Sequence, residues 1–308
     1  MSTIKDSRLY KLLVRIAFFV SVVFILWVSR ELYLWYVYFN ALAVWLGYVY
    51  IVVALAATVY FLVLPVLHLF LLPSFGEPET SDDPARQKQA LLRRAKMLKI
   101  HPHELQGKSI DELNELLHRR LQQCAADVEK IRNRYVLTTA IGTAASQSAI
   151  VDLYIVLSCC LKVMLKTLKA YGGRTSLKDT YHILRDIVIS GALGASEFAE
   201  LGGNVLAELG AKSMTKIPVA NIVLESAADG FVNAYLVCRV AMITENYCTV
   251  AYVGKDKHWM PSLKATVGAT RSILLGSYDL IKEKLGPAVG LAFSFLLKFG
   301  KKGEPETA

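Results

Sequence analysis

Two apolar runs dominate the first quarter of the chain. Residues 12–28 carry one charge, Arg15, near the start of the run, and residues 32–72 contain no Asp, Glu, Lys or Arg. A helix needs roughly 20 apolar residues to cross a bilayer, so the pattern predicts two membrane spans, at about 12–31 and about 43–64. The apolar region continues too far for a secretory signal peptide.

The segment between the two spans, 33–40, is rich in Trp and Tyr. These side chains collect at the headgroup level of a bilayer, so we expect the tip of a helical hairpin there. Pro65 and Pro73 are expected to help end the second helix. The alternative is one long kinked span that pairs Arg30 with Glu31.

Basic residues flank the pair of spans on its outer sides. Three precede the first span, six follow the second between residues 86 and 99, and only Arg30 lies in the turn. By the positive-inside rule, both termini lie in the cytoplasm. The five cysteines show no paired or metal-binding spacing, which indicates a reducing compartment. The pattern therefore predicts a multi-pass membrane protein with cytoplasmic termini.

A linker rich in Pro, Gly and acidic residues, 73–85, follows the spans. Helical spacing of Leu and Ala predicts a helix over 85–99, and Ser109 with Glu112 forms a capping-box pattern ahead of a second helix. The apolar stripe of that second helix consists of Leu113, Leu116, Leu117, Leu121, Val128 and Ile131. Residues 84–135 hold 12 Lys/Arg and 6 Asp/Glu, a balance of 12 − 6 = +6. We interpret this part as a solvated helical pair; the alternatives are a stalk against anionic headgroups and a docking face.

The segment 136–162 begins rich in Ala, Thr and Ser and becomes strongly apolar, with Asp152 in its middle. It is long enough to cross a bilayer. Packing inside a helical bundle is the equal alternative, because an acid in such a segment needs a polar partner. The sequence Tyr-Gly-Gly-Arg at 171–174 then closes a helix as a glycine C-cap does.

Small residues recur at every fourth position within 183–211, a spacing that lets two helix backbones approach closely. They are Gly191, Ala195, Ala199, Gly203 and Ala207. Polar residues share a face of this helix and of the next one by helical periodicity. They are Asp186, Glu197 and Glu200 in the first helix, and Glu225, Asp229 and Arg239 in the second. We expect Arg185 and Arg239 to pair with some of the acids. The acids are interpreted as structural or water-facing; the alternative is a proton or cation pathway.

Two further helices are expected near the end of the chain. Periodicity predicts a helix over about 262–285. The stretch 287–302 is short for a span and ends in Lys298, Lys301 and Lys302. That pattern suits a helix lying in the membrane interface, with a docked core helix as the alternative.

A family resemblance rests on motifs in the second half of the chain. They are Arg-Tyr, Thr-Ala and Ala-Ser-x-x-x-x-Val-Asp, then Tyr171-Gly172-Gly173-Arg174 and Leu184-Arg185-Asp186, then a Gly/Ala-rich helix and Cys238-Arg239. In this order they resemble the YcjF family of bacterial inner-membrane proteins, over about residues 133 to 247. The family usually has Ser-Pro where this chain has Ser146-Gln147. The resemblance implies a bacterial inner-membrane protein whose domain of unknown function also occurs behind small Ras-like and Era-like GTPase domains.

No motif of a known catalytic chemistry is present in the sequence. The chain contains no GxxxxGK[ST] phosphate-binding loop, no GxSxG nucleophile motif and no HExxH zinc motif. His101 and His103 flank a proline and have no third ligand in sequence. The net charge is +9, but the sequence contains no nucleic-acid-binding motif. We therefore assign the basic residues to the cytoplasmic side of the membrane. We expect no catalytic residue, cofactor, metal or nucleic-acid partner.

These observations combine into one prediction of fold and function. The fold class is all-α, with a membrane anchor at 1–72, a cytoplasmic helical linker at 73–135, a Gly/Ala-rich, YcjF-like, membrane-associated domain at 136–250 and amphipathic helices at 251–308. The expected function is a non-catalytic anchor or interaction module for a GTPase or ATPase partner. That partner would engage Arg174, Lys178 and Arg185, and self-association is a further option. The alternative is a small ion or proton transporter that uses intramembrane carboxylates.

Overall fold

A computed structural model of the chain describes residues 29–30, 32–74, 83–146, 148–174, 218–249 and 261–299. This part of the chain is mostly helical. Its β-type pairing is an isolated bridge between Ser74 and Arg174, with no named strand among the described residues. The predicted all-α class is confirmed to that extent. The chain divides into two compact units, Met1–Val63 and Leu64–Ala308.

In the first unit, residues before and after Ala43 pack on one another. Ala43 has an extended backbone (φ −164°, ψ 137°) and interrupts the helix. The rings of Phe39 and Tyr50 stack with centroids 5.3 Å apart, and a Cβ on Gly47 would lie 2.9 Å from the ring of Tyr36. The aromatic segment expected at a turn is itself helical, and the break follows it. Most of the first predicted span lies outside the described residues, so the two-span hairpin stays a prediction.

One described helix is long and apolar enough to cross a membrane. It comprises α2 (Val44–Thr58), a π-helical turn (Val59–Val63) and α3 (Leu64–Leu71), 28 residues together, and only 6% of its most apolar stretch is buried. Pro65 does not end this helix, contrary to expectation. The wider π turn just before Pro65 accommodates a residue that has no N–H and crowds the preceding turn. The helix ends at Leu71, ahead of Pro73.

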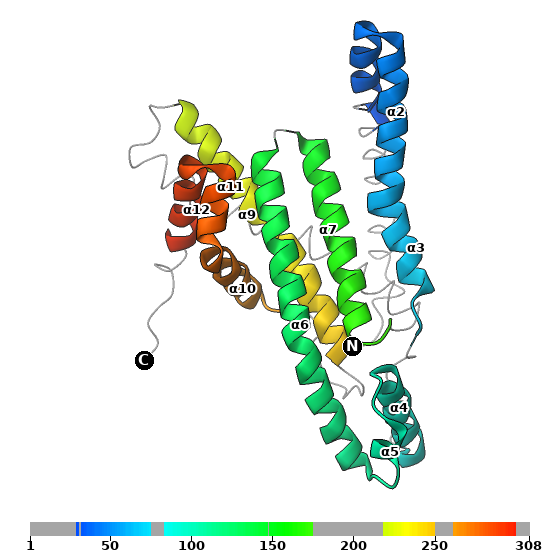
Figure 1. The fold of residues 1–308 in the computed structure, drawn as a ribbon. Helices are drawn as coiled ribbons and strands as arrows, with labels where there is room; N and C mark the ends of the chain where they lie inside the picture. Colours follow the sequence, from blue (N-terminus) through cyan, green and yellow to red (C-terminus); the bar gives the residue numbers. More distant parts are fainter. Residues whose placement is uncertain are drawn as a thin grey trace, which may run out of the picture. The chain divides into compact units, whose positions relative to one another are not determined.

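The second unit is a bundle of helices, shown in Figure 1. After α3 it contains α4 (Pro84–Met97), α5 (Pro102–Leu105), α6 (Ile110–Ala145), α7 (Ala149–Ala170), α9 (Pro218–Thr249), α10 (Leu263–Gly276), α11 (Tyr278–Leu285) and α12 (Pro287–Phe299). The long helices α6, α7 and α9 pack on each other and form the centre. Around them, α3 packs on α7, α4 packs on α6, and α10 and α12 pack on α9.

Local sequence signals explain where the first helices begin. The carboxylate of Asp83 accepts a hydrogen bond from the Ala85 N–H, and Pro84 occupies the first helical position of α4. At α6 the predicted capping box is present. Ser109 Oγ accepts from the Glu112 N–H at 3.3 Å, and Glu112 Oε2 accepts from the Ser109 N–H at 2.7 Å. The stripe that follows is buried at Leu113, Leu117, Leu121 and Val128, as its spacing predicts.

Two predicted helices are divided in the structure. The segment 136–162 is interrupted between Ala145 and Ala149, so α6 and α7 are separate helices, and α6 begins well before residue 136. The predicted helix over 262–285 is α10 and α11, which meet at Ser277.

The last described helix, α12, is packed against the bundle. Phe293 is fully buried, and a Cβ on Gly290 would lie 3.1 Å from the side chain of Lys282 in α11. Leu291, by contrast, is 64% exposed. The contacts of Phe293 and Gly290 agree with the docked alternative for this helix.

The small-residue helix of the sequence prediction falls outside the described residues. This applies to Gly191, Ala195, Ala199, Gly203 and Ala207, and to the polar candidates Arg185, Asp186, Glu197 and Glu200. The Gly/Ala-rich domain therefore stays a prediction in that part.

Candidate functional site

The Tyr-Gly-Gly-Arg segment ends α7 with two glycines in unusual conformations. Gly172 has φ +85° and Gly173 has φ +151°, and the Gly173 N–H donates to the Leu168 carbonyl at 2.9 Å. This is the glycine C-cap that the sequence predicts. The preceding residue, Tyr171, is 0% exposed and is part of the core.

The same two glycines allow other parts of the backbone to approach closely. A Cβ on Gly172 would lie 2.4 Å from the Met97 carbonyl oxygen, at the end of α4. A Cβ on Gly173 would lie 2.4 Å from the Pro73 carbonyl oxygen, just after α3. Any larger residue would push these backbones apart, so the glycines hold the ends of α3, α4 and α7 together.

Arg174 completes this contact with the end of α3. Its backbone N–H donates to the Pro73 carbonyl, and its Nε donates to the Leu72 carbonyl, both at 2.9 Å. The guanidinium therefore sits where the carbonyl groups of α3 carry partial negative charge. We call this group, formed by Leu72, Pro73, Met97, Gly172, Gly173 and Arg174, the anchor junction. It joins the end of the apolar helix to the helical bundle.

A buried arginine lies close to the anchor junction and was not anticipated. Arg94 of α4 is 2% exposed, and its Nη2 donates to the Cys248 carbonyl at the end of α9, at 2.7 Å. Burial lowers the pKa of Arg94, while the neighbouring Cys248, Cys124 and Tyr171 act in the opposite direction. Burial also raises the pKa of Cys248 to about 12, which keeps this thiol protonated and unreactive at neutral pH.

The charge pattern of 84–135 predicts that Arg94 is a solvated surface charge. That prediction is wrong, because Arg94 is buried. A signal was available, because Leu91, Arg94, Ala95 and Leu98 share one helical face. A lone Arg among apolar residues on that face indicates a guanidinium directed into the protein.

A second unanticipated pair joins α6 to α9. Arg132 and Glu245 approach to 2.9 Å, and their side chains are only 17% and 20% exposed. Burial raises the pKa of the Glu245 carboxyl, and the charge of Arg132 partly reverses that shift. The side chains are separated by more than 100 positions in sequence, so helical periodicity could not pair them.

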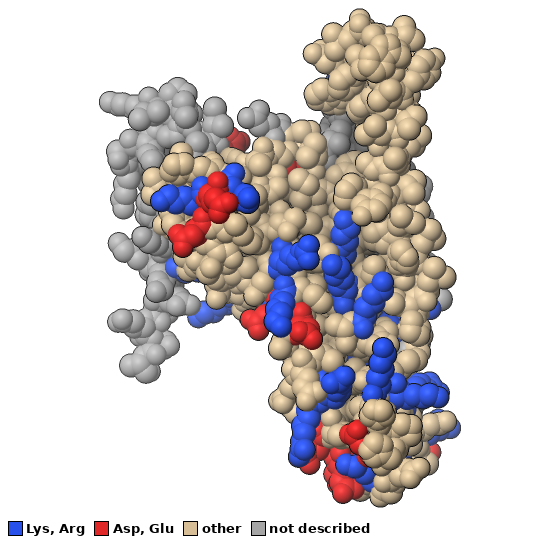
Figure 2. Space-filling view, viewed as in Figure 1, with Lys and Arg blue, Asp and Glu red and all other residues tan. Residues whose placement is uncertain are grey.

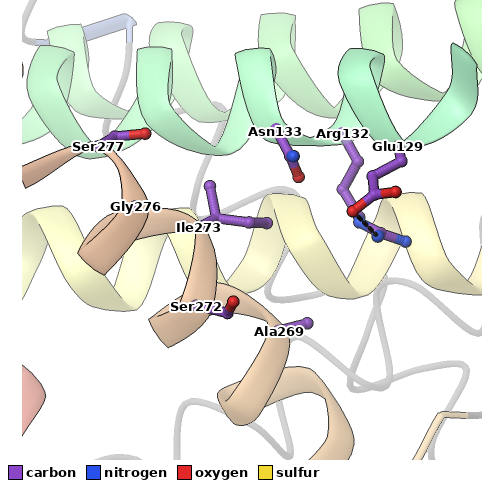
Figure 3. Close-up of a pocket in the computed structure, with 8 residues that line it drawn as sticks. All are labelled: Glu129, Arg132, Asn133, Ala269, Ser272, Ile273, Gly276 and Ser277. Atoms are coloured by element: carbon purple, nitrogen blue, oxygen red, sulfur yellow. Dashed lines mark ion pairs between the residues drawn. The ribbon is translucent and has the colours of Figure 1, made fainter. Parts of the chain in front are cut away.

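Arg132 also borders a small pocket between α6 and α10, shown in Figure 3. Its lining residues are Glu129, Arg132, Asn133, Ala269, Ser272, Ile273, Gly276 and Ser277. Arg132 also lies 4.0 Å from Glu129, and the volume is about 260 Å³. That volume lies below the range typical of sites for drug-sized ligands. The pocket suits water or a small polar molecule.

Three predicted carboxylates come together near the start of α7. Burial raises the pKa of Asp229, and the charges of Glu225 and Asp152 raise it further. Burial likewise raises the pKa of Asp152, against a hydrogen bond from Ser146. Ser226 of α9 donates to the Ala144 carbonyl at the end of α6, which ties the helices together here. Both shifts favour the protonated form of Asp152 and Asp229 relative to a solvent-exposed aspartate.

Arg239 does not pair with these acids among the described residues. Its Nη1 donates to the hydroxyl of Tyr235, one turn earlier in α9, at 2.7 Å. Among the described residues Arg239 thus forms a local hydrogen bond, and its pairing with the acids of 183–211 stays a prediction, because those acids lie outside the described residues. The other cation expected to answer the acids, Arg185, is outside the described residues. No group of three potential metal ligands gathers anywhere in the described part of the chain.

Comparison with known proteins gives one finding on relationship. The model of a family described as a domain of unknown function (DUF697) matches residues 108–269, from the capping box of α6 into α10. This range covers more than half of the 308 residues and includes the stretch that resembles the YcjF family. No curated protein and no solved structure matches significantly. The chain therefore belongs to the DUF697 family.

Proposed function

We propose that this protein is a YcjF-type protein of the bacterial inner membrane that anchors, or controls the membrane access of, a GTPase or ATPase partner. In this proposal it catalyses no reaction itself, and both of its termini lie in the cytoplasm. The observation that carries the proposal is the anchor junction. It fastens the end of the one described helix that is apolar enough to cross a membrane to the DUF697 domain.

The length of the apolar helix supports this arrangement. Crossing a bilayer takes roughly 20 residues, and the helix has 28. Its last eight residues, α3, pack on α7 and bury Leu69. The remaining residues, 44–63, are about the number that a bilayer requires. The nucleotide-hydrolysing partner comes from the resemblance to the YcjF family.

The test is purification of the full chain from its native membranes under mild detergent. We expect a protein with nucleotide-hydrolysing activity to be recovered with it, in an amount that depends on the nucleotide added. The chain itself should remain in the membrane pellet after alkaline washing. Recovery of the chain without any nucleotide-binding protein would count against the partner, whereas loss from the pellet would count against the anchor.

A second candidate function is a small transporter of protons or cations. The observation that favours it is the meeting of Asp152, Glu225 and Asp229, two of which have raised pKa values. In liposomes, the wild-type chain would then conduct ions, and Asp229→Asn or Glu197→Gln would abolish the flux. Absence of flux under every gradient would remove this function.

A further inference from the structure

One face of α7 carries a row of lysines. Lys162, Lys166 and Lys169 stand four and three residues apart and fall within about 60° of one another on the helix. No acid occurs between Asp152, in the first turn of α7, and Asp179, so the nearest acid in the same helix lies ten residues before Lys162. Figure 2 shows Lys and Arg side chains following one another along the face where α6 and α7 lie.

The row differs from the charged surface of α6. There, exposed cations pair with acids one turn away, as in Arg119–Glu115 and Lys130–Asp127. Within the described part of the chain, the exposed Lys166 and Lys169 form no ion pair. Instead, Lys166 Nζ lies 5.2 Å from the centroid of the Tyr135 ring on α6, which holds its stem along the bundle. Lys166 and Lys169 therefore present positive charge that no ion pair among the described residues compensates.

The anchor junction places this row along the chain's exit from the bilayer. α3 packs on α7, and both helices end at the junction between Leu72 and Arg174, so they run in parallel. The eight residues of α3 extend about 12 Å, at 1.5 Å per residue. The last two turns of α7, which contain Lys166 and Lys169, accordingly lie beside α3. Lys162 lies near the level at which α3 begins.

We propose that the lysine row Lys162, Lys166 and Lys169 binds the headgroups of anionic phospholipids where the apolar helix leaves the membrane. This inference rests on the proposed crossing of the bilayer by residues 44–63. Anionic headgroups attract basic side chains over a distance of about one Debye length, roughly 8–10 Å, and the row lies in that range. Lysine also suits this level because its stem packs on apolar surface while its ammonium reaches the headgroups.

The side chains that precede Lys162 in α7 agree with this assignment. No charged residue lies between Asp152 and Lys162, and Leu157 and Val151 are 39% and 47% exposed. Between Leu157 and Lys169 the exposed surface of α7 thus changes from apolar to cationic.

The test compares the full chain in nanodiscs of phosphatidylcholine with nanodiscs in which a quarter of the lipid is phosphatidylglycerol. Phosphatidylglycerol should raise the unfolding temperature of the wild type by several degrees, and half-molar salt should remove the rise. The variant Lys166→Glu/Lys169→Glu should lose it. The control Lys282→Glu/Lys284→Glu changes two exposed lysines of α11 by the same total charge and should retain it.

The remaining outcomes are equally decisive. An equal rise in wild type and row variant would overturn the proposal, as would no rise in wild type. Binding of a poly-glutamate peptide to the row without any lipid effect would also overturn it and indicate an acidic protein instead. Failure of the chain to insert into nanodiscs would reject the membrane anchor itself, whereas insertion without a lipid effect leaves the proposed function in place.

Discussion

At the scale of single residues, the anchor junction depends on two glycines and one arginine. From the sequence we expected Arg174 to contact a partner, but in the structure it donates hydrogen bonds to the carbonyl groups of Leu72 and Pro73. A side chain that caps a helix end is partly occupied, which makes it a poorer docking residue than the exposed Lys166 and Lys169. Arg174 therefore has a structural role in joining α3 to α7.

Replacing Gly172 with alanine should destabilise the fold by about 2–4 kcal/mol. Its φ of +85° disfavours any side chain, and the new Cβ would lie 2.4 Å from the Met97 carbonyl oxygen. Gly268→Ala is the matched control, since that glycine lies within α10 with open space around it and an alanine there favours the helix. Thermal unfolding in detergent measures both. Equal stability of the two variants would contradict the assigned close approach.

Asp229→Asn should raise stability at neutral pH and flatten its dependence on pH. Burial and the charges of Glu225 and Asp152 raise the pKa of Asp229 in the folded state. The folded protein then binds a proton more strongly than the unfolded chain, so its stability falls as pH rises between the ordinary and the raised pKa. The gain from Asp229→Asn should be larger at pH 7 than at pH 4. The exposed Asp127→Asn serves as control, and an equal gain at both pH values would refute the explanation.

At the scale of the elements, helix starts follow from sequence better than helix breaks do. The capping box at Ser109 and the proline at the start of α4 are local signals whose effect needs no distant partner. The interruptions between α6 and α7 and at Ser277 lack such a signal, because apolar periodicity continues on both sides. Pro65 shows the opposite case, in which a strong local signal for a helix end is overridden by a π turn.

Ser109→Ala should cost about 1 kcal/mol of stability. Its Oγ accepts the Glu112 N–H at the first turn of a 36-residue helix, and alanine would leave that donor without its cap. Ser277→Ala is the control, because Ser277 occupies the corresponding position of α11 without a side-chain cap. Chemical denaturation of both variants provides the comparison. A larger loss for Ser277→Ala would show that capping is not what stabilises α6.

At the scale of the whole molecule, the proposed topology depends on which side of the membrane each segment reaches. The apolar helix and the two basic flanks predict that the aromatic segment before Ala43 is external and that the DUF697 domain is cytoplasmic. Lys169, exposed on α7, offers a labelling position in that domain.

In a cysteine-free chain, we expect Tyr38→Cys to react with an impermeant reagent added outside, and Lys169→Cys only after the inner face is opened. Both side chains are exposed in the structure, so protection by the membrane is the quantity measured. External labelling of Lys169→Cys would mean that the chain crosses the bilayer again. Asp152 and Asp229 would then be candidates for a path through the bilayer, and the transporter would become the preferred function.

The sequence by itself determined the helical class, the apolar helix after Ala43, the caps of α4 and α6 and the glycine end of α7. Each of these depends on neighbours within one or two turns, so the residue pattern contains the information. Only the tertiary structure decided that Arg94 donates to the Cys248 carbonyl, that Arg132 pairs with Glu245 and that Arg174 holds α3. These contacts join residues more than 100 positions apart, and no local periodicity specifies which distant carbonyl or carboxylate will meet a given cation.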